Sequence, residues 1–133
     1  MKKILIVDDE PHIRIMLEQT LEDLEENDVE LLTAKDGQEG LEIALKEEPS
    51  LIFLDVMMPG EDGFSVCTTL KKDPLHADIP VILLSARGQD SDRDRGLSVG
   101  ALDFFTKPYS PSDLVRRVRE VLFDSGDNDA PDP

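Results

Sequence analysis

The 133-residue sequence has no tryptophan, one tyrosine and a single cysteine, Cys67. A single cysteine excludes an internal disulfide framework and favours a reducing compartment, so we expect a cytoplasmic protein. Basic residues are also scarce, because 14 Lys and Arg face 30 Asp and Glu and leave a net charge of -16. Such a charge repels nucleic acid and anionic membrane surfaces, so we expect no direct binding to either. The apolar runs are too short to span a bilayer, and no signal peptide opens the sequence.

Short, uninterrupted apolar runs are what the sequence does contain, at residues 4–7, 51–54 and 81–84. A strand with one face in water would alternate apolar and polar residues, so these runs predict strands covered by helices on both faces. Stretches of helical periodicity separate the strands that we expect near residues 3–7, 29–33, 51–54, 81–84 and 103–105. Five such βα units in one domain predict an α/β fold, a doubly wound parallel sheet with strand order 2-1-3-4-5.

The expected helices differ in how clearly they are marked. The last one is the clearest, with Ser110 as N-cap, Pro111 next and Asp113 in the capping-box position. Apolar stripes mark the buried faces of four helices: Ile13, Leu17, Thr20, Leu21 and Leu24; Leu41, Ala44 and Leu45; Phe64, Cys67 and Leu70; Leu114, Val118, Val121 and Leu122. We place the domain at residues 1–123. Residues 124–133 are acidic, lack large apolar side chains and are expected to form a disordered tail or the start of a linker.

Charged and hydroxyl side chains follow the predicted strands at their carboxyl ends: Asp8 and Asp9, Asp55, Ser85 and Lys107. In an open α/β sheet these ends meet at the binding crevice. Closely spaced carboxylates repel one another unless a cation offsets their charge. Oxygen ligands without a His or Cys cluster favour Mg²⁺ or Mn²⁺ over Zn²⁺, and Mg²⁺ commonly binds phosphate oxygens as well. The sequence therefore predicts a metal-dependent phosphoryl site in which Lys107 supplies a fixed positive charge.

Each of these residues also has a plainer interpretation. Charged residues after strands are often solvated loop residues, Lys107 can simply pair with Asp55, and Ser85 can cap the next helix. The two histidines, His12 and His76, are isolated in the sequence, and we expect both at the surface.

Together, the motifs resemble those of the receiver domain of two-component response regulators, including chemotaxis response regulators. The similarity runs from about residue 2 to residue 123 and rests on the segments 4–10, 55–63, 85–86 and 107–108. The resemblance implies a flavodoxin-like (βα)5 fold that accepts phosphate from a sensor histidine kinase or a phosphotransfer protein. It also implies that the chain catalyses only its own phosphorylation and dephosphorylation and is not an enzyme with an external substrate.

The resemblance assigns a role to each matching residue. Asp55 corresponds to the phosphoacceptor, and Asp8 and Asp9 to the acidic pair that binds Mg²⁺ with it. Met57 corresponds to the position whose backbone carbonyl contacts the metal. Further matches are the invariant lysine, the switch hydroxyl and the switch aromatic residue, at Lys107, Ser85 and Phe104.

The expected output of the switch is a change in the face made by the fourth helix, fifth strand and fifth helix. Four charged residues match positions that pair across a homodimer of receivers attached to transcription factors: Arg93, Asp103, Asp113 and Arg117. Met57 and Arg87 occupy the positions that tune dephosphorylation, so the lifetime of the phosphoryl group is not predictable.

Other functions are less compatible with these residues. The acidic loop after the first strand would repel the phosphate of a flavin. Met57 stands where an aspartate-dependent phosphatase needs a second acid. A phosphorylation-independent pseudo-receiver, acting only as an interaction module, is the remaining alternative. Such a domain would lack one of the acidic pair, Asp55 or Lys107, and none of these residues is missing. The motifs do not distinguish a free-standing receiver from part of a longer regulator, and they do not identify the kinase, the signal or the output.

Overall fold

The computed structural model describes residues 2–22, 24, 28–58, 62–86, 90–107 and 109–124, without the side chains of residues 90, 91 and 124. Arg87, Pro108 and residues 125–133 of the predicted tail lie outside the described residues, whereas Asp124, the first residue of that tail, ends a helical turn. The domain boundary that we expect at residue 123 therefore stays a prediction.

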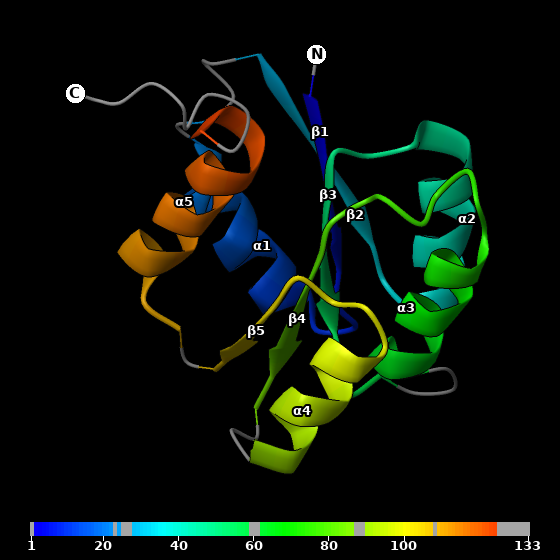
Figure 1. Cartoon of the computed structure of the whole chain (residues 1–133). Helices are drawn as coiled ribbons and strands as arrows, with labels where there is room; N and C mark the ends of the chain where they lie inside the picture. Colours follow the sequence, from blue (N-terminus) through cyan, green and yellow to red (C-terminus); the bar gives the residue numbers. More distant parts are fainter. Residues whose placement is uncertain are drawn as a thin grey trace.

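A parallel five-stranded sheet forms the centre of the molecule, with strand order β2-β1-β3-β4-β5 (Figure 1). The strands are β1 (Lys2–Val7), β2 (Val29–Ala34), β3 (Leu51–Asp55), β4 (Val81–Ser85) and β5 (Asp103–Thr106). They alternate with α1 (Pro11–Thr20), α2 (Gly37–Glu47), α3 (Gly63–Lys72), α4 (Asp90–Ser98) and α5 (Pro111–Arg119), after which a π-helical turn covers Glu120–Asp124. The predicted doubly wound α/β fold and its strand order are confirmed.

Both faces of the sheet are buried, as the uninterrupted apolar runs predicted. Alternate strand residues point to opposite faces, so Leu5 and Leu54 join one hydrophobic cluster and Ile4 and Phe53 join another. The first cluster packs under α2 and α3, and the second packs under α1 and α5. A rigid, doubly covered sheet therefore supports the loops at its carboxyl edge.

Helices α2, α3 and α5 begin at residues whose side chains cap them. The Ser110 side chain accepts a hydrogen bond from the amide of Asp113, which confirms the predicted N-cap of α5. The carboxylates of Asp36 and Asp62 cap α2 and α3 in the same way, each at 2.8 Å. Among the described residues, no helix is both long enough and apolar enough to cross a membrane.

Two details of the sequence-based prediction are wrong. Leu45 was expected on the buried face of α2 but is 43% exposed, because Ile43, which the predicted stripe did not include, packs against the core beside Leu41. His76 was expected at the surface but is 6% exposed. It is buried because the turn after α3 folds back on itself, with the His76 ring 2.9 Å from the Asp73 carboxylate.

Candidate functional site

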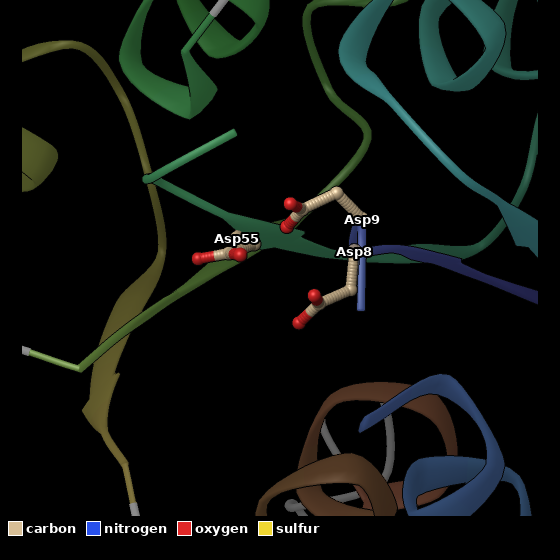
Figure 2. A group of neighbouring side chains, drawn as sticks. All are labelled: Asp8, Asp9 and Asp55. Atoms are coloured by element: carbon tan, nitrogen blue, oxygen red, sulfur yellow. The ribbon is translucent and has the colours of Figure 1, made fainter. Parts of the chain in front are cut away.

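The candidate site lies at the carboxyl edge of the sheet, where parallel strands end side by side. Val7 of β1 pairs in register with Leu54 of β3, so the residues that follow each of them are neighbours. Asp8 and Asp9 extend from the end of β1 toward Asp55, the last residue of β3 (Figure 2). The backbone amide of Lys107 donates to the Ser85 carbonyl at 2.7 Å, which joins the ends of β4 and β5 to the same edge. The structure thus brings these five residues together.

Three carboxylates converge in this site. Oxygen atoms of Asp8, Asp9 and Asp55 all lie within 4.8 Å of one another. Asp8 and Asp55 are buried and Asp9 is half-buried, so water screens their repulsion poorly. This all-oxygen donor set and its spacing fit a hard divalent cation such as Mg²⁺ or Mn²⁺. The residues present therefore suit the metal that the sequence predicts.

Lys107 supplies positive charge to the site. Its ammonium nitrogen lies 3.0 Å from Oδ2 of Asp8, 3.6 Å from Oδ2 of Asp55 and 4.0 Å from Oε1 of Glu10. The plainer interpretation, an ion pair with Asp55, thus holds in part, but Asp8 is the nearer partner. Lys107 bridges the two buried carboxylates.

The pKa values of the site show that one lysine does not neutralise it. Burial, followed by the charge of Asp8, raises the pKa of Asp55 to about 6, although Lys107 and the Met57 amide act in the opposite direction. Burial alone would lower the pKa of Lys107, but the Asp8 hydrogen bond and the surrounding carboxylates raise it above its ordinary value. A second cation would therefore be stabilised at this edge of the sheet.

The loop after β3 orients the Asp55 carboxylate. The backbone amide of Met57 donates a hydrogen bond to Oδ1 of Asp55 at 3.2 Å, while Oδ2 faces Lys107. The Met57 side chain is 52% exposed beside the site. The two oxygens of Asp55 thus have different surroundings, which fixes the plane of the carboxylate.

The sequence analysis missed Arg14, which lies close to the site. Its Nη1 atom donates a hydrogen bond of 2.6 Å to the backbone carbonyl of Asp8. Asp8 is further fixed by its Oδ1, which accepts from the Glu10 amide at 3.0 Å. The contact between Arg14 and Asp8 joins a helix to the preceding loop, and neither residue type nor spacing signals such a contact in a single sequence.

Ser85 and Phe104 lie on the same face of the sheet, at neighbouring positions of β4 and β5. The register pairs Leu83 with Phe104 and Ser85 with Thr106, and both predicted switch residues are fully buried. Phe104 and Leu83 belong to the hydrophobic cluster under α2 and α3. The aromatic side chain therefore points inward in this structure.

The four charged residues of the predicted dimer face lie around one hollow between α4, β5 and α5. Each has a partner within the chain. Arg117 pairs with Asp103 at 2.8 Å, and Asp113 pairs with Arg116 at 2.7 Å. The guanidinium of Arg93 lies over the Phe104 ring, 5.5 Å from its centroid. The structure therefore groups these residues, although their contacts here are intramolecular.

Comparison with known proteins gives one family. A family model described as "Response regulator receiver domain" matches residues 4–119. The phosphate regulon transcriptional regulatory protein PhoB of Pseudomonas aeruginosa is 42% identical over 132 residues, which cover 99% of this chain and 56% of PhoB. The probable transcriptional regulator ycf27 of Porphyra purpurea is 48% identical over 121 residues, 91% of this chain and 47% of the relative. The chain thus spans about half the length of the curated relatives that it matches.

Solved structures show the same fold. The chemotaxis protein CheY4 of Vibrio cholerae has a TM-score of 0.82 and 33% identity, covering 92% of this chain and 99% of that one. A receiver domain of a DNA-binding response regulator from Colwellia psychrerythraea has a TM-score of 0.86 and 30% identity, covering 92% and 98%. The receiver domain of DrrB, solved in a BeF3-activated form, has a TM-score of 0.78 and 31% identity, covering 92% and 97%.

Proposed function

The chain belongs to the family of response regulator receiver domains of two-component systems, and we propose that it accepts a phosphoryl group on Asp55. The observation that carries the proposal is the placement of this carboxylate. Asp55 is 3% exposed, one of its oxygens lies within 4.8 Å of one oxygen each of Asp8 and Asp9, and its Oδ2 is 3.6 Å from Lys107. A nucleophile, a metal site and a fixed cation thus share one edge of the sheet.

The reaction is a displacement at phosphorus. An oxygen of the Asp55 carboxylate forms a bond to phosphorus as the bond to the donor's leaving group breaks, with the two bonds in line. A Mg²⁺ ion bound by the three carboxylates would neutralise charge on the transferred group. Lys107 places a second positive charge near the phosphoryl oxygens, and the Met57 amide holds Asp55 in orientation. Positioning and charge stabilisation are therefore what this chain contributes.

The proposal includes one further metal ligand and one alternative ion. The backbone carbonyl of Met57 is proposed as a ligand beside Asp8, Asp9 and Asp55. Mn²⁺ is expected to replace Mg²⁺, because both ions favour carboxylate oxygens.

Phosphorylation is proposed to act on the rest of the molecule through Ser85 and Phe104. The Ser85 hydroxyl would donate a hydrogen bond to a phosphoryl oxygen. The neighbouring Phe104 side chain, which is buried here, would be stabilised in this inward position. Through α4, β5 and α5 this local event would change one surface of the domain. Homodimerisation through Arg93, Asp103, Asp113 and Arg117 would require Asp103 and Asp113 to exchange their present intramolecular partners.

The proposed partners follow from the family. A sensor histidine kinase or a phosphotransfer protein would supply the phosphoryl group. Phosphoryl transfer to Asp55 and hydrolysis of the resulting aspartyl phosphate would be the only chemistry that the domain catalyses. A cytoplasmic location is proposed on the grounds of composition. The relatives PhoB and ycf27 are named as transcriptional regulators, so control of transcription by a further domain is one proposed output.

The direct test is phosphorylation by a small acyl phosphate in the presence of Mg²⁺. We expect the wild-type chain to gain one phosphoryl group, stable in acid and labile in base, as measured by intact mass. Asp55→Ala should gain none, whereas the control Asp78→Ala, which removes an exposed carboxylate outside the site, should behave as wild type. A base-labile adduct that persists in Asp55→Ala would refute the assignment.

A second test separates the switch from an inert interaction module. Beryllofluoride with Mg²⁺ should change the amide spectrum of α4, β5 and α5, as expected for a domain related to the BeF3-activated DrrB receiver. A pseudo-receiver would show neither this change nor a new oligomeric state. The same experiment on Asp55→Ala provides the control, because that variant lacks the carboxylate on which the adduct forms.

A further inference from the structure

Arg14 of α1 reaches back to the loop that carries two of the three metal-site carboxylates. Its Nη1 atom donates to the backbone carbonyl of Asp8 at 2.6 Å, across six residues of sequence. Asp8 is 0% exposed, so this carbonyl has no access to water. A short hydrogen bond from a charged donor to a buried acceptor is among the stronger contacts of its kind.

Arg14 binds a backbone carbonyl and not a carboxylate, which separates it from an ordinary ion pair. The Arg14 side chain lies near an acidic loop, yet it forms no ion pair with any carboxylate of the described residues. Its charge is directed instead to the backbone at the corner between β1 and α1. From this corner Asp8 and Asp9 extend toward Asp55.

The other polar groups of Asp8 are held as well. Oδ1 accepts from the Glu10 amide at 3.0 Å, Oδ2 accepts from Lys107 at 3.0 Å, and the Asp8 amide donates to the Ala34 carbonyl at 3.2 Å. Arg14 completes this set by holding the carbonyl. Without it, the repulsion between the clustered carboxylates would act on a corner that has lost one of its restraints.

We propose that Arg14 is a positioning residue for the divalent cation. By holding the Asp8 carbonyl, it keeps the carboxylates of Asp8 and Asp9 in the arrangement in which they meet Asp55 on one ion. This inference rests on the proposed function, because it takes the three carboxylates to be the metal ligands.

The sign of the effect separates positioning from simple electrostatics. Removal of a positive charge near the site strengthens the attraction for Mg²⁺ if charge is all that matters. Removal of a positioning residue weakens Mg²⁺ binding, typically by tenfold or more when the lost contact holds a metal ligand. The two explanations therefore predict opposite changes in Kd.

The experiment is a calorimetric titration of Mg²⁺ into the wild-type chain, Arg14→Ala, Arg14→Gln and the control Lys72→Ala. Lys72 is an exposed cation in the last turn of α3, so its removal makes the same change in net charge at another place. All titrations use one ionic strength and a temperature at which circular dichroism shows each variant folded. Urea unfolding without Mg²⁺ is measured separately, since a loss of stability alone does not alter the Kd of the folded protein.

We expect the Kd for Mg²⁺ to rise by about tenfold in Arg14→Ala and in Arg14→Gln, and to stay within about twofold of wild type in Lys72→Ala. If Arg14→Ala does not fold, Arg14→Gln gives the same comparison with most of the side-chain volume retained. An unchanged or lower Kd in the folded Arg14 variants overturns the inference and leaves the proposed function intact. A wild-type chain that binds no Mg²⁺ overturns both.

Discussion

Helices α4 and α5 lie on either side of β5 and contain nine residues each, but they contact the sheet in different ways. In α5, Leu114 and Val118 are fully buried, and Ser110 and Pro111 define its start. In α4, Gly96 is the one buried residue among residues 92–98. Strong packing therefore fixes α5, whereas α4 adds little buried apolar surface to the core.

Two arginines of α4 contact aromatic rings. The guanidinium of Arg95 lies over the Phe64 ring at 4.3 Å from its centroid, and that of Arg93 lies over Phe104 at 5.5 Å. Contacts between exposed cations and aromatic rings are weak compared with a buried leucine. A shift of α4 thus costs less than a shift of α5. The face made by α4, β5 and α5 thus has one firmly packed side, α5, and one loosely packed side, α4.

The largest expected difference between the two helices is in their apolar residues. Leu114→Ala in α5 removes a fully buried side chain and should lower the free energy of unfolding by about 2–5 kcal/mol. Leu97→Ala in α4 removes a side chain that is 47% exposed and should change this free energy by less than about 0.5 kcal/mol. Urea unfolding measures both values. Similar losses in the two variants would mean that α4 is packed as firmly as α5.

The next prediction concerns the charge of the site at the carboxyl edge of the sheet. Lys107 follows β5 and pairs with Asp8 and Asp55, and if this one cation offset the carboxylates, Asp55→Asn would destabilise the protein. Because the pKa of Asp55 is raised to about 6, we expect the opposite. At pH 7 without metal, the substitution should raise the free energy of unfolding by about 1–3 kcal/mol.

The same shift fixes the pH dependence of stability. The unfolded chain releases the Asp55 proton near pH 4 and the folded chain releases it near pH 6, so the folded state binds more protons between these values. The free energy of unfolding that comes from Asp55 therefore falls as the pH rises from about 4 to about 6. Glu47 and Asp73, whose pKa values are lowered, act in the opposite direction, so the test is the difference between variants. In urea unfolding at several pH values, the free energy of unfolding of the wild type relative to Asp55→Asn should fall over this range, and that of the wild type relative to the control Asp78→Asn should stay constant.

A smaller effect tests the close contact between α4 and the sheet. A Cβ at Gly96 would lie 2.8 Å from Cδ1 of Leu83 and 3.2 Å from Cδ2 of Phe104. Alanine stabilises an exposed helix position by about 1 kcal/mol relative to glycine, but overpacking in a core costs about 1–3 kcal/mol. Gly96→Ala should therefore lose about 1 kcal/mol net.

The control for Gly96→Ala is Ser98→Ala, an exposed position of the same helix that should be neutral or slightly stabilising. Amide chemical shifts should change in α4 and at Phe104 after Gly96→Ala, and much less in α5. A more stable Gly96→Ala variant would show that the side chains of Leu83 and Phe104 move aside without loss of stability.

The contrast between these helices also shows what a single sequence could predict. The stripe of α5 and its capping residues are local patterns, and the structure has both. The apolar runs that end in Asp8, Asp55 and Ser85 are also local, so the strand order and the meeting of these residues at one edge followed from the rules of parallel sheets. The chemical roles of these residues, however, stay predictions that only solution experiments test.

What the sequence could not predict depends on contacts between distant or oppositely facing segments. The burial of His76 depends on how the turn after α3 folds back, and nothing in its neighbours signals it. The stacking of Arg93 and Arg95 on aromatic rings is not visible in a helix whose sequence is almost entirely polar. Arg14 likewise has no apolar or charged pattern that would indicate its bond to the Asp8 carbonyl.

The smallest expected effect concerns the stacking of Arg95 on Phe64. Arg95→Ala should lower the free energy of unfolding by about 0.5–1 kcal/mol, and Arg119→Ala, an exposed arginine at the end of α5, by less than about 0.5 kcal/mol. A double-mutant cycle with Phe64→Leu isolates the contact, because it subtracts the effect of each side chain on the rest of the protein. A coupling energy near zero would mean that the stacking of Arg95 on Phe64 does not help to hold α4, which would make this helix still easier to displace than its two stacked arginines indicate.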